Sequence, residues 1–178
     1  MKTTYNIDPA HSSAHFVARH MMITNVRGSF QSMKGTIVYD PDDPAASSIE
    51  ASIDASSINT NEPQRDTHLK SPDFLDVAEF PTIDFKSTSV TNDGEGEYKV
   101  NGTLSIHGVT KPVTLKVEGP SPEGKDPWGN TRIGASASTK IKRSDFGLTW
   151  NAVLETGGFL VGDELKIELE VQAIKASS

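Results

Sequence analysis

The stretch Arg65-Asp66-Thr67-His68-Leu69-Lys70-Ser71-Pro72-Asp73-Phe74-Leu75-Asp76-Val77 interrupts a chain that otherwise alternates apolar and polar residues with a period of two. Asn61 precedes Glu62-Pro63, and Ser71 precedes Pro72, so each is a candidate N-cap of a short helix. We therefore predict two helical pieces, about 62–70 and 72–76, that meet at Ser71. The alternative is a long packed loop. A capped helical plug inside an all-β chain favours a lid over a closed sheet.

The alternation on both sides of this plug predicts eight strands. They cover residues 13–19, 26–39, 49–55, 82–89, 98–107, 113–117, 133–141 and 165–171. The second strand is interrupted at Met33–Gly35, where the glycine indicates a bulge and a bend. The turn after the fifth strand is placed at 108–111 rather than at Asn101-Gly102, because the alternation continues through Gly102 in phase. Residues 119–127 are predicted to form a long exposed loop, and residues 143–148 a tight or 3₁₀ turn.

Eight antiparallel strands with one apolar face can form a two-layer sandwich or a closed barrel. An eight-stranded barrel is just wide enough either to fill itself or to hold one small ligand. Small residues on the inward face favour the second arrangement, because they leave space that large side chains would fill. They are Ala14, Ala18, Ala51, Ala55, Gly102, Ala135 and Ala137. Few ionisable residues fall on that face, so the predicted space suits a lipid-like ligand.

Length and composition restrict the function further. The 178 residues predict a single domain, 1–178, and the chain contains no cysteine, which excludes disulfides, iron–sulfur clusters and thiol nucleophiles. A formal charge of −7 argues against nucleic-acid binding, which needs clustered Lys and Arg. No apolar run approaches the length of a membrane span, so stable membrane insertion is not expected. Because residues 1–8 lack the apolar core of a signal peptide, we expect a cytoplasmic protein, or a periplasmic or secreted one if a signal was removed.

The chain resembles the YceI family of polyisoprenoid-binding, lipocalin-like barrel proteins from about Tyr5 to Val171. No single motif is specific to this family, but the set of motifs in this order along the chain is. The residues that carry the resemblance are Asp8-Pro9-Ala10-His11-Ser12 with Phe16 and His20, Val26-Arg27-Gly28-Ser29-Phe30, the stretch 65–76 with Phe80-Pro81, residues 101–113, and Arg143-Ser144-Asp145-Phe146-Gly147-Leu148. The chain departs from the family in lacking a signal sequence and in carrying Leu75 where relatives often have a second aromatic residue.

This resemblance implies an elongated, eight-stranded antiparallel barrel with a helical plug at about 62–76, whose core holds an extended isoprenoid or fatty-acyl chain. It implies no catalytic activity and no cofactor other than the bound lipid. The residues expected to line the cavity are Phe16, Phe30, Ile37, Ile53, Phe85, Leu104, Ile106, Leu115, Ala135, Ala137, Ile167 and Leu169. The family positions and their placement on loops put His20, Arg27, Arg65 and His68 near the polar head of the lipid, at the mouth of the barrel.

Two other classes of function remain open, an enzyme and a structural domain, whereas a metal site is not expected. His11 and His15 have a chelating spacing on a helix, but on a strand four residues span roughly 13 Å, too far for one metal ion, so no metal site is expected. An enzyme acting on the lipid would place His20, Arg65, Asp66 and His68 around the head group. A structural or stress-response β-domain would have a filled core and no ligand. The sequence also leaves a homodimer open.

Overall fold

The computed structural model describes residues 1–152, 154 and 160–177. Among these residues the one α-helix is α1 (Pro63–Lys70), and four 3₁₀ turns are η1 (Pro9–His11), η2 (Pro44–Ala46), η3 (Ala55–Ser57) and η4 (Arg143–Phe146). The strands are β1 (Thr3–Ile7), β2 (Ser13–His20), β3 (Thr24–Phe30), β4 (Met33–Tyr39), β5 (Ser48–Asp54), β6 (Ile58–Asn59), β7 (Thr82–Gly94), β8 (Glu97–Ile106), β9 (Val109–Glu118), β10 (Gly124–Lys125), β11 (Thr131–Lys142) and β12 (Val161–Lys175).

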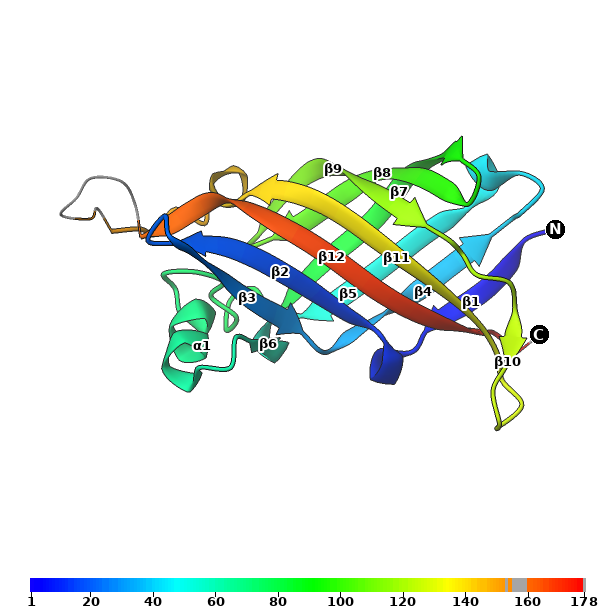
Figure 1. Cartoon of the computed structure of the whole chain (residues 1–178), viewed down its shortest axis with the longest axis horizontal. Coiled ribbons are helices and arrows are strands. Elements are labelled where there is room, and N and C mark those ends of the chain that lie inside the picture. Colours follow the sequence, from blue (N-terminus) through cyan, green and yellow to red (C-terminus); the bar gives the residue numbers. More distant parts are fainter. Residues whose placement is uncertain (153, 155–159, 178) are drawn as a thin grey trace.

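The described strands close into an eight-stranded antiparallel barrel, which confirms the predicted fold class. The ring runs β11-β9-β8-β7-β5-β4-β1-β12, and the pairing of β12 with β11 from Glu164 to Ile174 closes it. Figure 1 shows the resulting elongated cage of long, tilted strands. Each wall strand alternates inward apolar and outward polar residues, so the interior is apolar along its length.

At two positions around the barrel, two short strands follow one another along the wall: β2 and β1 at the position next to β12, and β3 and β4 at the position after it. Beside β12, strand β2 pairs with residues 161–170, and β1 pairs with residues 173–175. In the same way β3 pairs with β2, and β4 pairs with β1. The predicted single strand 26–39 therefore breaks at Gln31–Ser32, where the Ser32 carbonyl accepts a hydrogen bond from Asp54 N at 2.9 Å. The predicted bulge at Met33–Gly35 is wrong, because β4 pairs with β5 through these residues without a register shift, and the chain bends just before Met33 instead.

Strand β1 is missing from the sequence prediction. Its burial alternates, with Tyr5 and Ile7 inside and polar residues between them. Five residues ending at Asp8-Pro9 give too short a pattern to distinguish a strand from an extended tail. Pairing with β4 and β12, far away in the sequence, is what makes it a strand.

The plug contains one helix rather than two. The N-cap of α1 is Glu62, whose carboxylate accepts from Gln64 N and Arg65 N, and not the predicted Asn61, which has a left-handed φ of 64°. Residues 72–76 form hydrogen-bonded turns instead of a second helix. The carbonyl of Ser71 accepts from Phe74 N and from Asp76 N, and Asp76 has a φ of 48°, which ends any helical run.

Two smaller predictions also need correction. The turn between β8 and β9 lies at His107–Gly108, both with positive φ, and β9 starts at Val109 rather than Val113. The predicted loop 119–127 contributes β10 to the edge of β11. The 3₁₀ turn predicted at 143–148 is confirmed by η4. The prediction that one strand continues through Gly102 is confirmed by β8.

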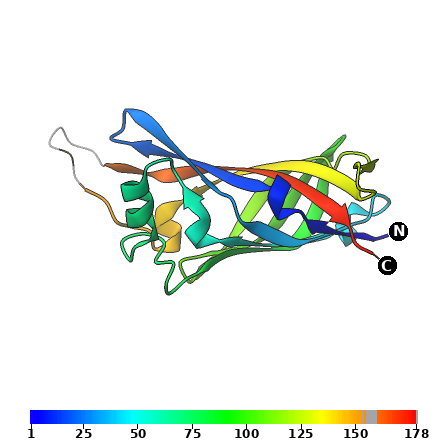
Figure 2. The ribbon, with the colours of Figure 1, turned by 90° about the horizontal axis from the view of Figure 1, so that it is seen from below.

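The buried residues gather toward the two ends of the barrel. One cluster lies under the plug and includes Ile58, Leu75, Ile106, Ile141 and Phe146. Two others lie toward the opposite end, around Tyr5 with Ile133 and Ala173, and around Val90 with Val100 and Leu115. Figure 2 shows α1 and η4 together at the first end, and the two chain termini at the second. Between these clusters the barrel interior is not filled.

Candidate functional site: an apolar cavity in the barrel

An elongated cavity occupies the barrel interior. Its volume is about 230 Å³, much more than the one or two waters that fit the ordinary voids of a packed protein. Along β12 the lining extends from Val161 to Val171. About ten residues at 3.3 Å each, tilted near 40° to the barrel axis, span roughly 25 Å. This length suits a chain-like ligand.

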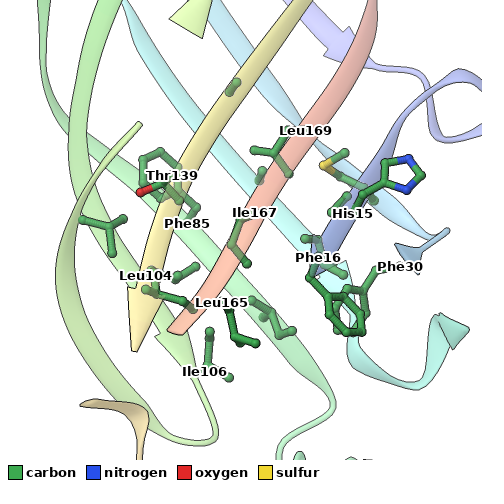
Figure 3. Close-up of a pocket in the computed structure, with 18 of the residues that line it drawn as sticks. His15, Phe16, Phe30, Phe85, Leu104, Ile106, Thr139, Leu165, Ile167 and Leu169 are labelled. Atoms are coloured by element: carbon green, nitrogen blue, oxygen red, sulfur yellow. The ribbon is translucent and has the colours of Figure 1, made fainter. Parts of the chain in front are cut away.

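The cavity wall is built from inward-facing side chains that retain accessible surface. Phe85, Leu104, Ile167 and Leu169 are only partly buried although they face the barrel interior. Figure 3 shows these side chains converging from strands on different sides of the barrel. In a filled core such residues would be covered by their neighbours, so their residual exposure marks an unfilled space.

All twelve residues predicted to line the cavity do so in the structure. Whether they contact a ligand stays a prediction. Five of the seven predicted small inward residues also line it, but Ala55 and Gly102 do not. Ala55 is packed into the cluster under the plug, and the Phe85 ring lies over Gly102, where a Cβ would collide with it. The space at Gly102 is therefore used by an aromatic ring of the wall.

The sequence analysis missed several lining residues. They are Ile7, Ala14, Ala18, Met33, Ile49, Ala51, Ile58, Ile83, Val113, Val117, Ile141, Leu148, Val161, Leu165 and Val171; of these, Ala14, Ala18 and Ala51 were predicted only as small inward residues. Most continue the inward phase of a predicted strand, so the period-two alternation was a sufficient signal for them. Ile7 and Val161 lie in segments that were not predicted as strands.

Polar residues are rare in the wall. Among the described lining residues they are His15, Ser136, Thr139 and Arg143. The His15 ring is exposed, and its Nε2 forms a hydrogen bond of 2.8 Å with Ser13 Oγ. The ring points away from the other lining side chains (Figure 3). Thr139 Oγ1 donates to the Thr114 carbonyl at 2.9 Å. Arg143 is the one ionised side chain of this lining with little access to solvent.

The plug supplies one end wall of the cavity. Leu69, Phe74 and Leu75 line it, and the last two are 7% and 8% exposed. The Phe74 ring packs against His68 and Trp150, with centroid separations of 5.1 Å in both pairs. His68 and Trp150 are themselves 4.8 Å apart, edge to face. The predicted plug therefore closes this end of the cavity through Leu69, Phe74 and Leu75.

Arg65 and Asp66 fasten this plug to the barrel. Arg65 Nε donates to Thr60 Oγ1 and Nη2 donates to the Thr60 carbonyl, both at 2.8 Å. Thr60 N and Oγ1 donate in turn to Asp66 Oδ1. His68 Nε2 lies 2.9 Å from Asp73 Oδ2 within the plug. These three side chains are engaged with the plug and with Thr60, and none lines the cavity.

The other two residues predicted near the head group lie on the β2–β3 ribbon. His20 is the last residue of β2, half-buried, and is paired with Val161 of β12. Arg27 is exposed on β3, where its neighbours Val26 and Gly28 are less exposed, so it lies on the outer face. The four predicted head-group residues are thus not gathered at one point, and their contact with a ligand stays a prediction.

Arg143 is the charged group that the sequence analysis did not single out. It is 5% exposed and lines the cavity at the plug end. Its guanidinium donates to the carbonyls of Leu148 and Gly162 at 2.9 Å, with longer contacts to those of Trp150 and Val161 at 3.3 and 3.4 Å. Burial lowers its pKa, and the nearby Asp163 partly offsets the effect. Arg143 therefore holds η4 and the start of β12 together.

An ion-pair network lies at the opposite end of the barrel. Arg132 donates from Nη1 to Asp8 and from Nε to Asp126, both at 2.6 Å. The bond from Arg132 lowers the pKa of Asp8 to about 2, with a further contribution from His11. Burial alone would raise the pKa of Asp126, but bonds from Arg132 and Asn130 outweigh it and lower that pKa to about 2. This network is the part of the structure that acid should weaken.

A tyrosine pair lies in the interior near this end. The Tyr39 and Tyr98 hydroxyls are 3.3 Å apart, and burial together with this bond raises the pKa of Tyr39 to about 12. Both rings border a smaller cavity of about 60 Å³, which shares Ile37, Ile49, Val117, Ala135 and Val171 with the main one. The two cavities therefore adjoin along these five residues.

Within residues 1–152, 154 and 160–177, no group of three His, Asp or Glu residues is placed to hold a metal ion. His11 bonds to Asp8 and His15 to Ser13, so the two histidines have separate partners. Over the same residues, no helix has the length and apolar character needed to cross a bilayer.

A closed antiparallel barrel with an apolar, chain-shaped interior defines a class of small-molecule-binding barrels. Comparison with known proteins is more specific. The model of the YceI-like domain matches residues 5–173. The YceI protein of Salmonella newport is 40% identical over 147 residues, covering 82% of this chain and 76% of that protein. The chain belongs to the YceI-like family.

Solved structures share the same fold. Burkholderia cenocepacia BcnA superposes with a TM-score of 0.81 at 24% identity, covering 93% of this chain and 98% of that one. A polyisoprenoid binding domain from Saccharophagus degradans, implicated in plant cell wall breakdown, superposes with a TM-score of 0.69 at 16% identity, covering 98% and 99% of the two chains. At these identities the likeness concerns the fold alone.

Proposed function

We propose that the protein binds a long-chain isoprenoid or fatty-acyl lipid in the barrel and sequesters or carries it. The observation that carries the proposal is the elongated cavity of about 230 Å³, whose lining is apolar apart from four residues. Burial of a hydrocarbon chain against such a wall is favourable in proportion to the apolar area removed from water. The membership in the YceI-like family and the fold shared with a polyisoprenoid binding domain support the same class of ligand.

The dimensions restrict how such a ligand would sit. A length of roughly 25 Å holds an acyl chain lengthwise, whereas a long polyprenyl tail has to bend or protrude. At about 0.3 kcal/mol per heavy atom, a ligand of about forty carbons gains ~12 kcal/mol, which corresponds to a nanomolar dissociation constant. Apolar burial thus supplies most of the affinity, and the polar head sets the choice among lipids.

The alternative of an enzyme acting on the lipid has less support. Arg65 and Asp66, two of its four proposed residues, are bonded to Thr60 and fasten the plug. The third alternative, a filled structural domain, has to account for a cavity that ordinary core packing does not leave. We propose binding without chemical turnover.

Organic extraction of the purified protein followed by mass spectrometry tests the proposal. Protein from native cells and from an expression host should both release about one apolar chain per barrel, with different lipids reflecting the two sources. Recovery of the chain unchanged after prolonged incubation separates a carrier from an enzyme. If neither preparation releases a lipid and none titrates into the protein, the proposal is wrong.

A further inference from the structure

Three consecutive apolar side chains are exposed at the turn between β2 and β3. Met21, Met22 and Ile23 are 41%, 61% and 69% exposed. In the described part of the chain the other large, exposed apolar residues are Met1 and Trp128. Single exposed apolar residues are ordinary on a protein surface, but a continuous group at a projecting tip marks an interaction site. We call Met21–Ile23 the apolar tip.

The backbone of the apolar tip makes its composition unusual. Met21 and Met22 have φ angles of 53° and 58°, and Ile23 N donates to the His20 carbonyl at 3.1 Å. The three-residue connection between His20 and Thr24 thus contains a β-turn with both central residues left-handed, a geometry that Asn-Gly and Asp-Gly adopt most easily. Two methionines hold it at a conformational cost and expose apolar surface as well. Formation of the turn alone therefore does not explain these residues.

Cationic side chains surround the apolar tip on the same ribbon. Arg19 is exposed, donates to the Met22 carbonyl at 3.2 Å, and pairs with Asn25 across the ribbon. Arg27 is exposed on the outer face of β3. The Arg19 guanidinium therefore lies at the turn itself, and at about 3.3 Å per residue the backbone of Arg27 lies roughly 13 Å from the turn. An apolar tip with one guanidinium beside it and another farther along the ribbon suits the acyl boundary and the phosphate layer of a phospholipid bilayer.

The same ribbon also forms part of the cavity wall. Ala18 lines the cavity and pairs with Leu165, and the next pairing, between His20 and the lining residue Val161, is adjacent to Met21. Figure 1 places this turn at the end of the barrel where α1 lies. The outer side of β3 pairs with the two-residue strand β6 at Ser29 and Phe30, at the end of β3 that is far from the turn. The apolar tip is thus next to the end that the plug closes.

We propose that the apolar tip is a bilayer-contact element, which brings the plug end of the barrel against the surface of a phospholipid membrane. The role of this contact, exchange of the carried lipid with the bilayer, rests on the proposed function. The contact itself depends on the tip alone. Insertion of two or three side chains from a small turn gives weak, reversible binding, as exchange requires.

Trp128 provides a matched control at the opposite end of the barrel. It is 78% exposed, and its loop is held by Asp126, which accepts from Trp128 N and Asn130 N at 2.9 Å. Replacement by Ser removes an exposed apolar group of larger size without touching the apolar tip. If the apolar tip is the membrane contact, substitutions in the tip should release the protein from a membrane, and substitution of Trp128 should not.

The experiment is flotation of the full chain with vesicles of phosphatidylethanolamine and phosphatidylglycerol. The variant carries Met21→Asn with Met22→Gly, which suits the turn and removes its apolar side chains, so it should be at least as stable as the parent in thermal denaturation. We expect vesicle binding to fall about tenfold in this variant. Ile23→Ser alone should weaken binding by less, and Trp128→Ser should bind as the parent does.

Three results would overturn the proposal: a parent protein that does not bind vesicles, binding that depends on Trp128 instead, or sedimentation showing a dimer that the tip variant converts to monomers without any vesicle binding. Extraction of lipid from the same samples keeps the two proposals apart. Lipid in the barrel with no vesicle binding contradicts the apolar tip only. Vesicle binding by a barrel that never holds a lipid contradicts the proposed function.

Discussion

The buried side chain of Arg143 connects several backbone segments at the plug end of the barrel. Its guanidinium donates to four backbone carbonyls between residues 148 and 162, and the Phe74 ring lies 5.9 Å from its Cζ atom. An Arg side chain stays protonated in proteins even when burial lowers its pKa. Backbone dipoles therefore stabilise the charge at the end of an apolar cavity, and the same bonds fix the start of β12.

Replacing this side chain tests that account. Arg143→Met keeps the length of the side chain but leaves several buried carbonyls without donors, so it should lower the free energy of unfolding by roughly 3 kcal/mol. Urea denaturation measures the change. The matched control is Arg27→Met, an exposed position on β3 where we expect a change within about 0.5 kcal/mol. Equal effects at the two positions would contradict the structural role of Arg143.

The Arg132 network predicts a pH dependence. The pKa of Asp8 and that of Asp126 are both about 2 in the folded protein, below the ordinary value of 3.8. Carboxylates with a lowered folded pKa contribute stability that is complete above the ordinary pKa and is lost as the pH falls toward 2. The free energy of unfolding should therefore decrease between pH 4 and pH 2.

Asp8→Asn isolates this contribution. Because Asn cannot ionise, the variant should be less stable than the parent near neutral pH, and the two curves should converge as the pH approaches 2. Chemical denaturation across this range gives both curves. Arg132→Met should flatten the curve in the same way, since it removes the partner that lowers both pKa values. A parent curve with no acid dependence would contradict the network.

At the scale of elements, the plug is the segment on which the barrel's closure depends. Only α1 within it is regular, and turns carry Phe74 and Leu75 into the end of the cavity. Phe74 packs between His68 and Trp150, which come from the plug and from the segment after η4. The plug is therefore held by side-chain packing and by the bonds to Thr60, with little contribution from helix length.

Phe74→Ala should lower the free energy of unfolding by about 3 kcal/mol, because it removes a buried ring and leaves a space that the plug fills poorly. Thermal or urea denaturation measures the loss. Gln64→Ala is the matched control, since Gln64 is an exposed residue of the same plug, and should change stability by less than about 0.5 kcal/mol. A near-neutral Phe74→Ala would mean that the plug is a loose loop and does not close the cavity.

At the scale of the whole molecule, the cavity itself is the property to test. Ala137 lines the cavity, and its neighbour Ser138 is exposed on the outer face of β11. Ala137→Phe should displace bound lipid while unfolding stays cooperative, because a ligand-sized space accommodates the ring. Ser138→Phe places the same ring one residue away on the other face and should leave the lipid content unchanged. Extraction with mass spectrometry measures lipid, and denaturation measures stability.

If the barrel interior is filled, Ala137→Phe should destabilise the protein and leave its lipid content unchanged. Overpacking by Ala137→Phe would then cost roughly 1–3 kcal/mol, with no effect on lipid content. Removal of lipid from the parent provides a further readout. A ligand at a hundredfold excess over its dissociation constant stabilises the folded state by about 2.7 kcal/mol, so the delipidated protein should unfold at a lower temperature.

Local pattern was enough for much of the architecture. Strands such as β8 and β12 show unbroken alternation, and the inward phase of that alternation places Leu104, Ile106, Ile167 and Leu169 in the cavity wall. The resemblance to a known family then distinguished a barrel from a sandwich, which the alternation alone left open. The plug was recognisable because Pro63, Pro72 and the polar caps interrupt the alternation at one place.

The tertiary structure decided what depends on partners distant in the sequence. β1 is a strand because β4 and β12 pair with it. Arg143 is buried because carbonyls from residues 148–162 surround it. The sequence by itself determined which residues face inward, since side-chain direction in a strand is local. Only the closed barrel determined which of them border empty space, because a cavity is a property of all its walls together.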